Sequence, residues 1–142
     1  VGDYEAILMA VAGSSSNKNF NKAVQTFEVA LKYFREVHTR SVQPSSRIDA
    51  YFIKSCRMHL PKGGSRRKLV GKALELCLSS HLASVHVVGE VYRAEPQVLE
   101  AALAKRGVSF DVEVGEMNIP TDWCSRVAVH KRRHHVNLKD WK

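Results

Sequence analysis

An amphipathic pattern in residues 20–37 constrains the fold of this chain more than any other feature. Its apolar residues recur three or four positions apart, the spacing of one face of an α-helix, and they are Phe20, Ala23, Val24, Phe27, Leu31 and Phe34. Lysine, glutamine and glutamate residues fill the opposite side. Each phenylalanine contributes roughly 1.5–3 kcal/mol when it leaves water, so the stripe needs partners that cover it. We therefore predict a mainly α-helical protein organised around this helix.

Two helical hairpins are predicted in the first 83 residues. Residues 3–12 form a short helix that Gly13 ends, and the long helix runs to about His38. Ser46 and Asp49 resemble a capping box for a helix over residues 47–58, with an apolar stripe of Ile48, Tyr51, Phe52 and Cys56. Ser65 is predicted to cap a further helix to about Leu82, with an inward face of Leu69, Ala73, Leu76, Cys77 and Ser80.

The C-terminal third has a different pattern. Residues 84–92 are rich in β-branched side chains and fit a strand or a helix, whereas residues 108–114 alternate apolar and polar side chains as a strand does. Pro96 and Gly107 bracket a helix with Leu99, Ala102 and Leu103 facing inward. Little periodicity follows Gly115. The predicted fold class is mainly α, with two repeat-like hairpins in residues 1–83, a small α+β part in residues 84–115 and an extended basic tail in residues 116–142.

Length and composition are those of one globular domain. The chain has 142 residues, and no apolar run approaches the roughly 18–20 residues that cross a bilayer. Because the chain begins at Val1 rather than Met, we expect a processed or trimmed product, and a targeting peptide would have preceded it. The three cysteines include no C-x-x-C pair, which favours a reducing compartment over a disulfide scaffold.

Positive charge is concentrated in two parts of the chain. The net charge is +8, and residues 124–142 hold six Lys or Arg against one Asp or Glu. Residues 1–107 hold 16 against nine, whereas residues 108–123 hold four acidic residues and no basic ones. A basic body, a short acidic stretch and a basic tail favour a polyanionic partner, and the alternative is a basic protein that is merely soluble.

Two basic clusters are the predicted contacts to a phosphate backbone. The first lies at the start of a predicted helix and comprises Arg66, Arg67, Lys68 and Lys72. The second comprises Arg126, His130, Lys131, Arg132, Arg133, His134, His135, Lys139 and Trp141. Trp141 and Trp123 are predicted to stack on unpaired bases. The alternatives are a solvated loop for the first cluster, and a solvated tail or localisation signal for the second.

Other chemistry has weaker support in the sequence. The Gly71–Lys72 pair is not part of a nucleotide phosphate loop, because Ala73 follows it where such a loop has Ser or Thr. Cys124 with His130 and His134 has zinc-ligand chemistry but no second cysteine nearby. We therefore expect no metal site and no catalytic residues.

The segments NKAVQTFEVALKYF and GKALELCLSS resemble the second helices of pentatricopeptide or tetratricopeptide hairpins. The resemblance covers a little over half of the chain and implies a repeat-like helical fold. The offset of 47 residues from Tyr4 to Tyr51 exceeds the period of about 34 residues in such repeats. The base-reading positions of pentatricopeptide proteins have no match in this sequence, so no base-reading code is carried over. A small, basic, repeat-derived chain with a basic tail is similar in style to lineage-specific mitochondrial ribosomal proteins.

The leading hypothesis is a non-enzymatic structural subunit of a mitochondrial ribosome or related ribonucleoprotein, located in the mitochondrial matrix. Its expected partners are rRNA and neighbouring protein subunits, without cofactor, small-molecule substrate or membrane span. The alternative is a helical accessory subunit of an organellar respiratory or other membrane complex without RNA contact. A third hypothesis is a small enzyme that uses Cys124 and the tail histidines.

Overall fold

The computed structural model describes residues 32, 36, 46–108, 115–127 and 134–141. Lys32 and Glu36 are helical, as predicted for the long helix. The remainder of the first hairpin, with its phenylalanine stripe, lies outside the described residues. So do residues 109–114 of the strand predicted over residues 108–114, and the basic run of residues 130–133.

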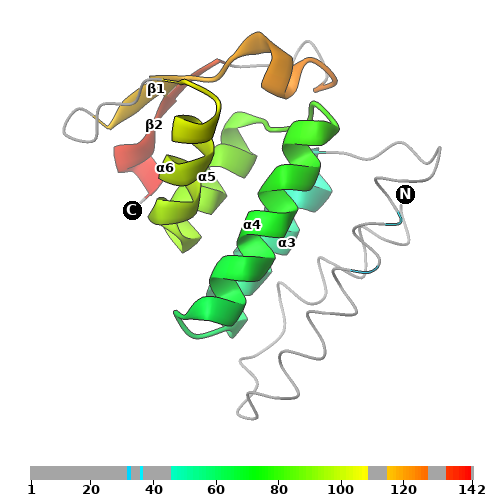
Figure 1. Cartoon of the computed structure of the whole chain (residues 1–142), viewed down its shortest axis with the longest axis vertical. Coiled ribbons are helices and arrows are strands. Elements are labelled where there is room, and N and C mark those ends of the chain that lie inside the picture. Colours follow the sequence, from blue (N-terminus) through cyan, green and yellow to red (C-terminus); the bar gives the residue numbers. More distant parts are fainter. Residues whose placement is uncertain (1–31, 33–35, 37–45, 109–114, 128–133, 142) are drawn as a thin grey trace.

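Four helices and a small sheet form the described fold (Figure 1). The helices are α3 (Ser46–His59), α4 (Gly64–Ser79), α5 (Val85–Ala94) and α6 (Pro96–Lys105). They are followed by strand β1 (Glu116–Asn118), the 3₁₀ helix η1 (Thr121–Cys124), strand β2 (His135–Asn137) and the 3₁₀ helix η3 (Leu138–Trp141). The predicted fold class, mainly α with a small α+β part at the C-terminal end, is confirmed.

The helical pair α3–α4 forms at the predicted place but with different ends. Gly63 is the N-cap of α4 and offers no side-chain hydrogen bond, so the prediction that Ser65 caps this helix is wrong. Asp49, predicted to complete a capping box, is fully buried and hydrogen-bonded to the Cys77 thiol. The apolar stripes were predicted correctly in their centres, since Phe52, Cys56, Leu69, Ala73 and Cys77 are all buried.

The ambiguous segment of residues 84–92 is helical. The Ser84 hydroxyl accepts a hydrogen bond from the backbone N–H of Val87 over 3.3 Å and caps α5. Val87, Val88 and Val91 are then buried along one helix, so tertiary packing outweighs the β preference of these residues. Helix α5 contacts the other three helices together with β2 and η3, which makes it the centre of the described fold.

Helix α6 matches its prediction closely. Pro96 occupies the first turn, and Gly107 follows the helix with a φ of 68°, a left-handed conformation that glycine adopts without strain. Leu99, Ala102 and Leu103 are buried as expected. Local start and stop signals were sufficient here.

The described parts of residues 115–141 are packed into the fold and do not simply extend across its surface. Strands β1 and β2 pair antiparallel with Met117 opposite Val136, and both side chains are buried. Backbone hydrogen bonds tie this segment to the connection between α4 and α5, including Ala83 N–H to the Trp123 carbonyl over 2.8 Å and Arg126 N–H to the His81 carbonyl over 3.0 Å. Seven of its apolar residues join the core, and they are Met117, Ile119, Trp123, Cys124, Val127, Val136 and Leu138.

Candidate nucleic-acid interface

The first basic cluster is divided by helix geometry. Consecutive residues of an α-helix point about 100° apart, so three adjacent cations cannot share one face. Arg67 and Lys68 are exposed on α4, and Lys72 is half-buried one turn further along. Arg66 instead points into the fold, where only 5% of its surface is exposed.

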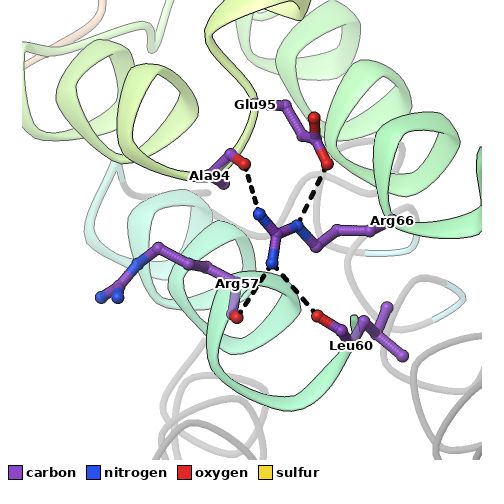
Figure 2. Close-up of polar contacts among 5 residues, drawn as sticks. All are labelled: Arg57, Leu60, Arg66, Ala94 and Glu95. Atoms are coloured by element: carbon purple, nitrogen blue, oxygen red, sulfur yellow. Dashed lines mark hydrogen bonds and ion pairs between the residues drawn. The ribbon is translucent and has the colours of Figure 1, made fainter. Parts of the chain in front are cut away.

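Arg66 makes four hydrogen bonds inside the protein, which use each of its three guanidinium nitrogens (Figure 2). Its Nε donates to Oε1 of Glu95 over 3.1 Å, and its Nη2 donates to the carbonyl of Ala94 over 2.6 Å. Its Nη1 donates to the carbonyls of Leu60 and Arg57 over 3.1 and 3.2 Å. A guanidinium occupied in this way cannot also bind a phosphate, so the assignment of Arg66 to the interface is corrected. The residue holds together the end of α3, the start of α4 and the α5–α6 junction.

A sequence signal for the burial of Arg66 was present. Arg66 precedes Leu69, Val70 and Ala73 by three, four and seven positions, so it continues the apolar stripe of α4. A charged residue on such a stripe is buried only when it is paired and hydrogen-bonded. Its partner Glu95 is 29 residues away, so the sequence pattern offered no pairing.

The exposed cations at the start of α4 have no acidic counterpart among the described residues. Lys62, Arg67 and Lys68 are exposed, and none of them forms an ion pair within the part of the chain that the structure describes. By contrast, Arg106 pairs with Glu75 over 2.9 Å and Arg93 with Glu90 over 3.8 Å. The first turn of α4 holds no acidic residue and its N-terminus has no side-chain cap. The described residues therefore leave the positive charge at this end without local neutralisation, and such charge attracts anions.

The described residues of the second cluster lie elsewhere. Arg126 is exposed, and its backbone is bonded to His81 beyond the C-terminal end of α4. A helix of 16 residues is about 24 Å long, so Arg126 and Arg67 lie near opposite ends of α4. Lys139 is exposed, and exposed His135 places Nε2 3.8 Å from Oε2 of Glu116. The structure does not bring the described parts of the two clusters into one patch.

Both tryptophans predicted to stack on bases are engaged within the fold. Trp123 is 5% exposed and belongs to the core. Trp141 is half-buried against α5, where its ring lies edge-on to that of His86 with centroids 5.8 Å apart and an interplanar angle of 79°. The ring also lies so close to Gly89 that a Cβ there would overlap it. The stacking role predicted for these residues is therefore corrected, because Trp123 and much of Trp141 are covered by protein.

His134 and Cys124 approach each other without forming a catalytic arrangement. His134 is exposed, and its Nδ1 lies 3.0 Å from the carbonyl oxygen of Ile119 and 3.9 Å from Sγ of Cys124. A carbonyl oxygen only accepts, so Nδ1 carries the proton and does not act as a base toward the thiol. No group of three or more His, Cys, Asp or Glu residues suited to a metal ion occurs among the residues described.

The thiols of Cys56 and Cys77 are unreactive because both are buried. Burial raises the pKa of Cys56 to about 12, although nearby Arg66 partly opposes this effect. Burial likewise raises the pKa of Cys77, and the adjacent Asp49 carboxylate adds to the increase. A thiol that stays protonated is neither a nucleophile nor a metal ligand, so both residues serve as core side chains.

Sequence reasoning missed an open groove between α4 and α6. The groove has a volume of about 560 Å³. It is lined by some of residues 71–79 of α4 and some of residues 98–105 of α6. Lys105, which no motif singled out, lines it together with Lys72. The two helices are adjacent only because both pack on α5, which the local pattern of neither helix reveals.

Comparison of the chain with protein-family models, curated proteins and solved structures found no match. The resemblance to helical-hairpin repeats therefore stays a prediction. Within the described residues, no helix combines the length and apolar character that crossing a bilayer requires.

Proposed function

We propose that this chain is a non-enzymatic structural subunit of a ribonucleoprotein, in the most specific form a mitochondrial ribosome, and that it contacts rRNA phosphates. The observation that carries the proposal is the set of exposed cations at the start of α4, Lys62, Arg67 and Lys68, for which the described residues provide no acidic partner. The net charge of +8 supports a polyanionic partner.

Phosphate contacts of this kind position a protein on RNA without reading its sequence. Arg67 offers a planar fork of donors, and Lys68 adds a mobile ammonium beside it. Arg66 supports them indirectly, since its bonds to Arg57 and Leu60 hold the loop that precedes α4. Binding should depend strongly on salt and weakly on base sequence.

The test measures binding of the full chain to a single-stranded RNA of mixed sequence by fluorescence anisotropy over a range of salt concentrations. We expect the double variant Arg67→Gln/Lys68→Gln to bind more weakly and to lower the slope of log K against log salt by about 1.4, since each phosphate contact contributes about 0.7. The matched control is Arg93→Gln/Lys105→Gln, which removes the same charge from exposed positions outside both basic clusters. If the two double variants weaken binding equally, or if the wild-type chain shows no salt-dependent binding, the proposed role of α4 is wrong.

Crosslinking of the endogenous protein in cells, followed by sequencing of the attached RNA, tests the assembly itself. An rRNA footprint that the Arg67→Gln/Lys68→Gln variant loses is the expected result. Absence of RNA, together with co-purification of membrane-complex subunits, would instead support an accessory subunit of an organellar membrane complex.

A further inference from the structure

The groove between α4 and α6 is an apolar surface with a basic rim. Leu76 of α4 and Val98 of α6 are half-buried and line the groove from its two sides. Ala101 of α6 also lines it and is exposed, and its small side chain fills little of the space. Gly71 also lines it, and a Cβ at that position would meet no atom within 4 Å. The small residues leave room for another chain to approach closely.

The dimensions of the groove match those of an α-helix. The lining extends from Gly71 to Ser79 on α4, about 12 Å, and from Val98 to Lys105 on α6, about 10.5 Å. An amphipathic helix that docks in a groove uses anchors at positions i, i+3 or i+4, and i+7, which span about 10.5 Å. Two helical turns of a partner therefore fit along the lining.

The charges around the groove select the partner. Glu75 is the acidic residue of the lining, and its Oε2 accepts a hydrogen bond from Nη2 of Arg106 over 2.9 Å. Lys72 and Lys105 lie on the rim, and neither has an acidic partner among the described residues. The rim is thus positive on both sides of an apolar lining. A phosphate backbone would gain nothing from that lining, whereas acidic residues beside an apolar stripe complement it.

We propose that this groove binds an amphipathic helix of a neighbouring protein, with its apolar stripe on Leu76 and Val98 and its acidic residues facing Lys72 and Lys105. The inference deepens the proposed function, because it assigns a surface to the protein neighbours of a subunit in a large assembly. It requires no RNA and does not involve Arg67 or Lys68, so the two proposals can fail separately.

The test is an NMR titration of the isotope-labelled full chain with two synthetic helical peptides. Both carry leucines at positions i, i+3 and i+7, and the flanking residues are glutamates in one peptide and lysines in the other. We expect the acidic peptide to shift the amide signals of residues 71–79 and 98–105 and to bind about tenfold more tightly than the basic one. The variant Lys72→Glu/Lys105→Glu should reverse this preference.

A matched pair of alanines provides the steric control. Ala101 lines the groove and Ala104, on the same helix, does not, although both are exposed. Ala101→Trp should abolish the shifts and Ala104→Trp should leave them unchanged. The proposal is overturned if neither peptide shifts the groove signals at about 1 mM, if both bind equally, or if the shifts lie elsewhere. It is also overturned if the groove signals move with the concentration of the protein alone, because the occupant would then be a second copy. Normal RNA binding in any of these cases would leave the proposed function standing.

Discussion

Arg66 of α4 and Glu95, the residue between α5 and α6, form a buried ion pair in which Nε donates to Oε1 over 3.1 Å (Figure 2). Their side chains are 6% and 10% exposed, so neither charge is well solvated. Three carbonyl groups accept further hydrogen bonds from the other two guanidinium nitrogens. The pair therefore depends on all of these contacts at once, since a buried charge is stable only when its hydrogen bonds are satisfied.

Arg66→Ala should lower the free energy of unfolding by about 3–5 kcal/mol, because it leaves the Glu95 carboxylate buried without its partner. Urea unfolding followed by circular dichroism measures this loss. Arg66→Lys should recover little of it, since an ammonium cannot reproduce the four directed bonds. Arg67→Ala is the control and should change stability by less than about 0.5 kcal/mol, because Arg67 is exposed. Equal effects of Arg66→Ala and Arg67→Ala would contradict the structural role of the ion pair.

Gly89→Ala should destabilise the protein by about 1–3 kcal/mol, because the added methyl group overlaps the Trp141 ring. Displacement of that ring should also change tryptophan fluorescence. Gly71→Ala is the matched control in another helix, where the methyl group meets open space, and it should stabilise by about 0.5–1 kcal/mol. If both variants are more stable than the wild type, the packing of Trp141 on α5 is wrong.

Glu90→Gln should make stability less dependent on pH. Burial raises the pKa of Glu90 above 4.5, since it outweighs the attraction of Arg57, Arg93 and Lys54. The folded protein then holds this proton at pH values where the unfolded chain has lost it, so stability falls as pH rises from 4.5 through the folded-state pKa. The neutral amide removes that fall, and urea midpoints between pH 4 and pH 7.5 should show it. Glu100→Gln, at an exposed position of α6, should retain the wild-type slope.

The thiols of Cys56, Cys77 and Cys124 should not react with a disulfide reagent at pH 8 while the protein is folded. All three are fully buried, and the pKa of Cys56 is raised to about 12. Their rate of modification should rise in parallel with unfolding in urea. Stability should also fall above pH 9, because the unfolded chain releases the Cys56 proton there and the folded protein does not. Rapid labelling of a cysteine in the folded protein would exclude this burial.

Helix boundaries were predicted best where the signals lie within one turn. Pro96 and Gly107 bounded α6 correctly, because each restricts its own backbone conformation. Residues 84–92 were ambiguous, because β-branched residues suit a strand and also a buried helix face. The Ser84 cap and the contacts of α5 with its neighbours resolve that ambiguity.

The candidate interface was predicted only in part. Arg67, Lys68 and Lys72 are accessible to solvent, fully or in part, whereas Arg66 and Trp141 are engaged inside the fold. The partners of these two residues are 29 and 52 positions away, at Glu95 and Gly89. Basic composition alone does not distinguish a cation that faces water from one that holds helices together.

The sequence by itself determined the mainly helical class, the positions of α3, α4 and α6, and the excess of positive charge. The spacing of apolar residues, the helix caps and the helix-breaking residues act over a few positions, so they can be recognised in the local sequence. Only the tertiary structure decided that Arg66 is buried and hydrogen-bonded to α3 and to the α5–α6 junction, that Trp141 packs on Gly89, and that α4 and α6 leave a groove between them. These outcomes depend on how far each helix rotates and which partners it meets, and that choice is made by the packing of distant segments against α5.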